Sequence, residues 1–179
     1  MAWNPPATFI SGAVLTAAQL NQIRESLLET ATAKATTAGR VIVATGLNAL
    51  TERAISDGTN NTSSGVTSTV YADLLASSGP AVTLTTGTTA MVHWAAQVTS
   101  TVAGAVGYCA PEILTSSVSA SDNNALIFEV SAANDVGRVA MSWHVTGLTP
   151  GTNTFTLKYK SGGADLVTFS RRHLWVFPH

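Results

Sequence analysis

Beyond residue 65, hydrophobic and polar positions alternate along most of the chain with a period of two. Residues 92–98 read Val-His-Trp-Ala-Ala-Gln-Val, and residues 138–145 read Arg-Val-Ala-Met-Ser-Trp-His-Val. Alternation of this kind is typical of strands that bury one face. Further strands are expected over residues 69–75, 81–85, 108–114, 125–130, 154–160, 164–169 and 171–177. About eight or nine strands with turns at this spacing favour a β-sandwich or barrel.

Glycine-rich segments punctuate this pattern. The sequences Gly-Leu-Thr-Pro-Gly at 147–151 and Ser-Gly-Gly at 161–163 are typical of tight turns, so we expect the last three strands to be sequential neighbours. Residues 57–65, Asp-Gly-Thr-Asn-Asn-Thr-Ser-Ser-Gly, have the composition of a linker loop. This loop predicts a domain boundary between residues 1–56 and residues 57–179.

A different pattern precedes the strands. Residues 3–9 contain two consecutive prolines, which favour an extended arm. A helix is expected to begin at Thr16, because Thr16 and Gln19 have the spacing of a capping box. Leu15 lies at the offset that lets it pack on Leu20 as a hydrophobic staple.

This helix has one hydrophobic face, formed by Leu20, Ile23 and Leu27. Short isolated helices are marginal in water, so the face must dock on another surface. That surface is the β domain of the same chain, a symmetry-related copy or a different protein, and we expect an intermolecular partner. Residues 40–44 and 49–55 then read as two strands joined by a turn, which predicts a small β-hairpin.

Composition narrows the function. The net charge is −1 and only 11% of residues are charged, so the chain has no basic field for nucleic acid. No charged leader followed by an apolar run opens the chain, and no stretch approaches the ~20 apolar residues of a membrane span. We therefore expect neither secretion by the common signal nor a membrane partner.

No familiar catalytic motif occurs in the sequence, and we expect a protein that is not an enzyme and has no cofactor or resident metal. His93, His144 and His173 lie in expected strands, where they are either metal ligands or surface histidines. Asp122 and Asp135 either bind a cation from loops or satisfy turns. The single cysteine is either a reactive thiol or a small core residue, Cys109.

Aromatic residues offer one binding chemistry, a platform that stacks on sugar rings. Trp94 and Trp143 share a face with aliphatic residues and are expected in the core. Trp175 alternates with Leu174 and Val176 and is expected to be exposed or interfacial. The candidate residues for surface recognition are Trp175, Tyr108, Asn123 and Asn124.

Three segments carry a family likeness. The opening Trp-Asn-Pro at residues 3–5, with Phe-Ile-Ser-Gly-Ala-Val-Leu-Thr-Ala-Ala-Gln-Leu-Asn at 9–21, resembles the start of many structural proteins of tailed bacteriophages. Residues 34–50 resemble the β-collar that follows the helix in such proteins, and residues 147–160 are similar to the penultimate hairpin of phage-borne jelly-roll domains.

This resemblance implies an antiparallel jelly-roll β-sandwich preceded by an extended arm, one short α-helix and a small β-hairpin. It also implies a non-enzymatic virion protein that is assembled in the host cytoplasm, forms a homotrimer in the manner of minor tail, fibre and capsid decoration proteins, and contacts other virion proteins of the capsid or tail. The residues expected to anchor it or to join its copies are Trp3, Phe9, Leu15, Leu20, Ile23 and Leu27. The alternative is a receptor-binding module whose jelly roll recognises host-surface carbohydrate.

Overall fold

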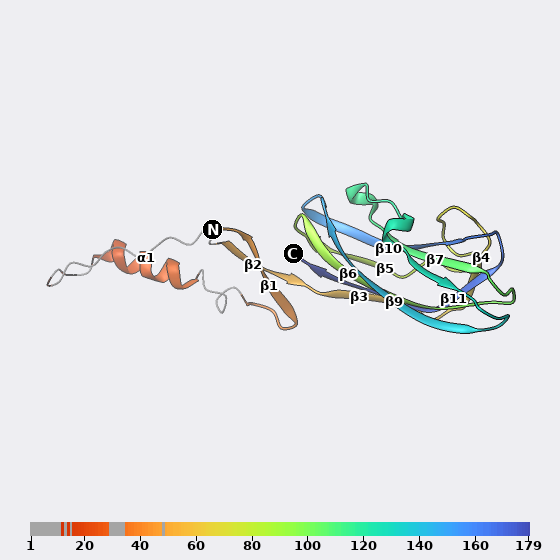
Figure 1. Cartoon of the computed structure of the whole chain (residues 1–179). Helices are drawn as coiled ribbons and strands as arrows, with labels where there is room; N and C mark the ends of the chain where they lie inside the picture. The colour runs from red at the N-terminus through yellow and green to blue at the C-terminus, as the bar shows by residue number, and fades with distance from the viewer. Residues whose placement is uncertain (1–11, 13, 15, 29–34, 48) are drawn as a thin grey trace. The chain divides into compact units, whose positions relative to one another are not determined.

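The computed structural model describes residues 12, 14, 16–28, 35–47 and 49–179. It divides into two compact units, one that ends at Ala54 and one that spans Ile55–Pro178 (Figure 1). The extended arm expected over residues 3–9 lies outside the described residues.

Helix α1 (Ala17–Leu28) lies in the first unit. The backbone N–H of Gln19 donates to Thr16 Oγ1 at 3.3 Å, and the backbone N–H of Thr16 donates to Gln19 Oε1 at 2.9 Å. This reciprocal pair confirms the predicted capping box, which satisfies two backbone donors at the helix start. The staple expected between Leu15 and Leu20 involves a residue outside the described part of the chain.

The first unit also contains an antiparallel hairpin of β1 (Arg40–Gly46) and β2 (Ala49–Ala54), which confirms the predicted hairpin. Glu52 ties the preceding segment to it, because its carboxylate accepts hydrogen bonds from Thr36 Oγ1 at 2.6 Å and from the backbone N–H groups of Thr36 and Thr37 at 3.0 and 3.2 Å. These bonds, with the Thr36 hydroxyl first, lower the pKa of Glu52. A two-stranded hairpin is nevertheless marginal without a packing partner.

The second unit consists of two antiparallel sheets. Its strands are β3 (Ser56–Asn60), β4 (Ser64–Val66), β5 (Ala81–Thr86), β6 (Thr89–Ser100), β7 (Val106–Glu112), β8 (Leu126–Glu129), β9 (Val136–Thr146), β10 (Gly151–Ser161) and β11 (Val167–Pro178). One sheet has the order β5-β10-β7-β8, and the other has the order β3-β11-β6-β9, with β4 also paired to β11. Short 3-10 helices η1 (Leu114–Ser116) and η2 (Asp122–Asn124) lie between β7 and β8.

Strand pairing identifies the topology. Strand β3 pairs with β11, β5 with β10, β6 with β9 and β7 with β8, which are the pairs of one long hairpin with four strands in each arm. Two further pairs, β11 with β6 and β10 with β7, join these into the two sheets. This is the arrangement of a jelly roll. The mainly β, antiparallel sandwich preceded by a helix and a hairpin is thus confirmed.

Two predictions about the last strands were wrong. The last three strands are not neighbours, because β9 and β11 lie in one sheet and β10 lies in the other. The tight-turn sequences at 147–151 and 161–163 instead connect strands of opposite sheets, as the folded hairpin requires. The strands expected over 164–169 and 171–177 are one strand, β11, which an irregularity interrupts between Ser170 and His173.

The segment 57–65 is not a linker, because it contains most of β3 and the start of β4. These polar residues favour turns locally, but pairing with β11 stabilises them as strands at the edge of the sheet. Conversely, residues 69–75 form no strand, and the β-pairing that they make is an isolated bridge between Ala72 and Tyr159.

A single hydrophobic core fills the sandwich. Its largest fully buried side chain is that of Trp94, whose indole N–H donates to the Cys109 carbonyl at 3.1 Å. The expectation that Trp94 lies in the core is confirmed, and Trp143 is partly buried against it. Cys109 is a buried core thiol, and burial raises its pKa. All of the buried residues that form this core lie in the second unit.

Candidate functional site

A bulge in β11 determines which of its side chains reach the surface. Phe169 pairs with Val98 and points inward, and regular alternation from Phe169 would carry His173 and Trp175 inward as well. Between Ser170 and His173 the register shifts by one residue, at an arginine with a φ of 46°. Bulges of this kind redirect the side chains that follow them. His173, Trp175 and Phe177 consequently lie on the outer face of the β3-β11-β6-β9 sheet, half-buried.

A groove of about 490 Å³ opens on this face. It crosses three strands, and it is lined by His93, Trp94, Ala140, Met141, Ser142, Trp175 and Phe177. His93 lies edge-on to Phe177, with the ring centres 5.3 Å apart and an angle of 82° between the ring planes. His93 Nδ1 is also hydrogen-bonded to Ser142 Oγ at 2.5 Å. The groove therefore combines aromatic walls with one polar imidazole–hydroxyl pair.

Trp175 thus lies where its alternation predicted, at the surface and half-buried. His173 stacks on its indole, with ring centres 5.1 Å apart and an angle of only 11° between the planes. His173 does not itself line the groove. The Trp175 indole therefore both stacks on an imidazole and lines the groove.

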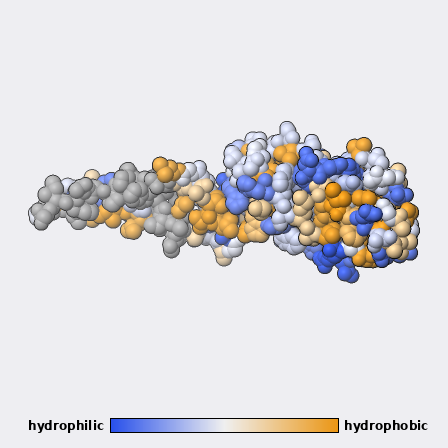
Figure 2. Space-filling view, in the orientation of Figure 1, coloured by the Kyte–Doolittle hydropathy of each residue, from blue (hydrophilic) through white to orange (hydrophobic). Residues whose placement is uncertain are grey.

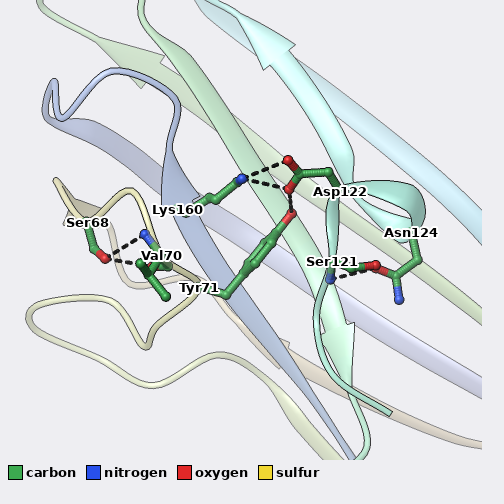
Figure 3. Close-up of polar contacts among 7 residues, drawn as sticks. All are labelled: Ser68, Val70, Tyr71, Ser121, Asp122, Asn124 and Lys160. Carbon is green, nitrogen blue, oxygen red and sulfur yellow. Dashed lines mark hydrogen bonds and ion pairs between the residues drawn. The ribbon is translucent and has the colours of Figure 1, made fainter.

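The opposite sheet carries a polar cluster of Tyr71, Asp122 and Lys160 (Figure 3). Lys160 Nζ lies 2.7 Å from Asp122 Oδ1 and 2.9 Å from Oδ2, and the Tyr71 hydroxyl donates to Oδ1 at 3.0 Å. The ammonium also lies 5.1 Å from the centre of the Tyr71 ring and 4.5 Å from that of Tyr108.

These contacts set the protonation of the cluster. Hydrogen bonding to Lys160 lowers the pKa of Asp122, whereas burial and then the hydrogen bond to Asp122 raise the pKa of Tyr71. The Lys160 ammonium is engaged by a carboxylate and two aromatic faces. The cluster joins the loop before β5 and the turn before β8 to β10, which is a structural role.

The other recognition candidates lie near this cluster. The Tyr108 ring lies under Lys160 and is half-buried, and Asn123 is exposed. Asn124 is not a surface residue, because it is 4% exposed and its Oδ1 accepts from the backbone N–H and hydroxyl of Ser121 at 2.9 and 3.0 Å. An asparagine that caps a short 3-10 turn in this way satisfies the backbone and has no oxygen to offer a ligand. Trp175 lies on the other sheet, so the four candidates do not form one site.

The candidate metal ligands do not converge. The part of the chain that the structure describes contains no group of three or more histidine, cysteine, aspartate or glutamate side chains arranged to hold an ion. Asp135 accepts hydrogen bonds from the Ser131 hydroxyl at 2.8 Å and from the Ala132 N–H at 3.2 Å, as a turn aspartate does. Glu112 lies 3.6 Å from Lys158 Nζ, so it is ion-paired on the sheet surface.

Sequence reasoning missed Arg172, which is fully buried. Its guanidinium donates to the Thr62 carbonyl at 2.9 Å, the Ser77 hydroxyl at 2.8 Å and the Ser78 carbonyl at 3.3 Å. It also lies 5.6 Å from the centre of the Tyr159 ring. In the sequence Arg172 directly follows Arg171, and only knowledge of the bulge would show which of the two arginines is buried.

The anchoring candidates divide between described and undescribed residues. Trp3, Phe9 and Leu15 lie outside the described part of the chain. On α1, Leu20 is 51% exposed, Leu27 is 62% exposed and Ile23 is half-buried. Figure 2 shows hydrophobic surface on α1 and on the hairpin. The described helix is too short and too polar to cross a membrane.

Comparison with known proteins gives only structural matches. No protein-family model matches the sequence, and no curated protein matches it. Thirty-four chains of solved structures match the fold. One of them belongs to the structure of the infectious bursal disease virus Gx strain, with 12% sequence identity and a TM-score of 0.41. The match covers 76% of this chain and 36% of that one, so this chain spans about a third of its length.

Proposed function

We propose that this chain is a non-enzymatic structural protein of a virion, in which the N-terminal unit assembles the protein and the jelly roll is displayed. The observation that carries the proposal is the contrast between the two units. The jelly roll has a complete core of its own, whereas no described residue of the first unit is buried. An ordered helix and hairpin without a core need a covering surface.

The apolar face of α1, formed by Leu20, Ile23 and Leu27, is the described part of that assembly surface. Each aliphatic side chain contributes roughly 1.5–3 kcal/mol when it passes from water to full burial. Because Leu20 and Leu27 are more than half exposed, most of this free energy is available to a contact between proteins. Trp3, Phe9 and Leu15 are proposed to extend the same contact.

The sequence resemblance to structural proteins of tailed bacteriophages supports three further details. It favours a homotrimer, a location on the capsid or tail, and a role as a capsid decoration protein or a short tail-associated spike. The connector between α1 and the jelly roll is short, which favours a short spike over a long fibre.

The mass of the full chain in solution tests the assembly role. We expect a particle of three times the 18.5 kDa chain mass, measured by light scattering after size-exclusion chromatography. Replacing Leu20, Ile23 and Leu27 together by serine should give single chains whose jelly roll still unfolds cooperatively. A monomeric wild-type chain, or a triple variant of unchanged mass, would overturn the assembly role.

A matched control exists on the same helix. Ala18, Asn21 and Glu25 have the same spacing as the apolar residues, lie on the opposite side of α1 and are exposed. Their replacement by serine imposes a comparable change in helix propensity without touching the apolar face. This control variant should keep the wild-type mass.

The virion role has its own test. Mass spectrometry of purified particles, from a host that encodes the chain, should detect its peptides. Particles made with the Leu20, Ile23 and Leu27 serine variant should lack them. Absence of the wild-type chain from purified particles would refute the virion role, whatever its mass in solution.

A second candidate function is recognition of host-surface carbohydrate by the jelly roll. The observation that favours it is the groove beside Trp175, where aromatic and hydrogen-bonding groups meet at the surface. Binding of the full chain to host cells, and competition by a soluble cell-wall glycan, would test this function.

A further inference from the structure

We propose that the groove between Trp175 and Phe177 binds one uncharged sugar ring. This inference deepens the second candidate function and rests on it, and it does not depend on the assembly role. It differs from the recognition surface expected from the sequence, because it involves neither Tyr108 nor the asparagines at 123 and 124.

The walls of the groove suit the apolar side of a sugar. His173 stacks on one side of the Trp175 indole, which itself lines the groove. Phe177 lines the groove two residues further along the same strand and is held edge-on by His93. A sugar presents several C–H groups on one side of its ring, and aromatic rings fixed in this way offer a flat hydrophobic contact at a low cost in conformational entropy.

The polar pair suits the hydroxyl groups of a sugar. A neutral imidazole has one donor nitrogen and one acceptor nitrogen. If Ser142 donates to His93 Nδ1, then Nε2–H is a free donor and Ser142 Oγ a free acceptor. If Nδ1–H donates to Ser142, then Nε2 is a free acceptor and the Ser142 hydroxyl a free donor. Either tautomer leaves one donor and one acceptor, which matches two neighbouring hydroxyl groups.

The charge and size of the groove favour a small uncharged ligand over a protein. None of the seven lining residues is an aspartate, glutamate, lysine or arginine. The volume of about 490 Å³ falls within the roughly 300–1,000 Å³ of small-molecule sites. A stable protein contact instead needs a broad surface of roughly 800 Å² on each partner.

Ligand-observed saturation-transfer NMR on the full chain tests the inference. The probes are the methyl glycosides of glucose, galactose, mannose and N-acetylglucosamine, each titrated up to its solubility limit so that weak binding is detected. We expect saturable binding of at least one glycoside. Trp175→Ala should weaken it more than tenfold, and Ser142→Ala should weaken it several-fold.

Two further variants make the result specific. Thr83→Ala removes an exposed hydroxyl from the other sheet and should leave binding unchanged. Ala140→Leu narrows the groove from an exposed position on β9 and should abolish binding even if Trp175→Ala proves unstable.

Three results would overturn the inference. These are failure of every glycoside to saturate, wild-type affinity in Trp175→Ala or Ala140→Leu, and a change in the solution mass of the protein on replacing Trp175. The last result would assign the face to contact between copies of the chain. Failure of the titration with an unchanged trimeric mass would leave the assembly role intact, so the two proposals can fail separately.

Discussion

Replacing Arg172 by methionine tests whether the buried guanidinium on β11 stabilises the jelly roll by binding the loops before β4 and β5. Arg172 is fully buried, and its three hydrogen bonds reach Thr62 before β4 and Ser77 and Ser78 before β5. No carboxylate within the described residues forms a salt bridge with it. Its hydrogen bonds to neutral oxygen atoms are therefore its main compensation for lost hydration.

The expected change in stability follows from opposing contributions. Methionine approximates the aliphatic part of arginine, and the loss of a buried charge would by itself favour the variant. Against this, each hydrogen bond to a charged group contributes about 1.5–3 kcal/mol, and each carbonyl left unpaired costs about 1–3 kcal/mol. Because Thr62 and Ser78 are near solvent, water recovers part of that cost. We expect Arg172→Met to lose about 2–4 kcal/mol of unfolding free energy.

Urea unfolding of the full chain measures this difference, and Arg171 provides the control. Arg171 is adjacent in the sequence but exposed, so Arg171→Met should change the unfolding free energy by less than about 0.5 kcal/mol. Amide hydrogen exchange in Arg172→Met should accelerate at residues 62–64 and 77–79 before the rest of the sandwich. An Arg172→Met variant as stable as the wild type, or an equal loss in the control, would refute the role given to the guanidinium.

Three further predictions follow from the core and the polar cluster. Trp94→Phe removes the hydrogen bond to the Cys109 carbonyl and part of the core volume, so urea unfolding should show a loss of about 1–3 kcal/mol. The Cys109 thiol is buried with a raised pKa, and a thiol reagent should label it only after unfolding; rapid labelling of the native protein would contradict its burial. The pKa of Asp122 is lowered by Lys160, so its contribution to stability is present above the unfolded pKa near ~4 and is lost as the pH falls through the folded value. The stability advantage of the wild type over Asp122→Asn should therefore shrink below about pH 4, and a pH-independent difference would exclude this linkage.

Local signals in the sequence were sufficient to predict the elements whose start or buried face depends on residues close together in the chain. The capping box at Thr16 located the start of α1, because both of its hydrogen bonds lie within one helical turn. The alternation over 92–98 and 138–145 located β6 and β9, because each strand buries one face against the same core. Trp94 and Trp175 were assigned to opposite environments by the same alternation.

Partners distant in the sequence decided the remaining structure. The residues of β3 favour turns locally, yet β11 pairs with them from more than 100 residues away. Residues 69–75 have the pattern of a strand, yet their backbone pairs with β10 only at the Ala72–Tyr159 bridge, because β5 pairs with residues 151–156 of β10. The groove is formed by three strands that are distant in the sequence. No local pattern therefore predicted that His93 and Ser142 would form a hydrogen bond.

The bulge in β11 explains why the two strands expected over 164–169 and 171–177 are one. The inward positions are Val167 and Phe169 before the bulge and Leu174 and Val176 after it, so the alternation changes phase by one residue. In a sequence, such a shift in the alternation of buried and exposed positions resembles a turn between two strands. Here the shift comes from one extra residue in the bulge, and β11 pairs with β6 both before and after it. The same change of phase buries one arginine and keeps Trp175 and Phe177 on the outer face, so the loop attachment and the groove have a common structural origin.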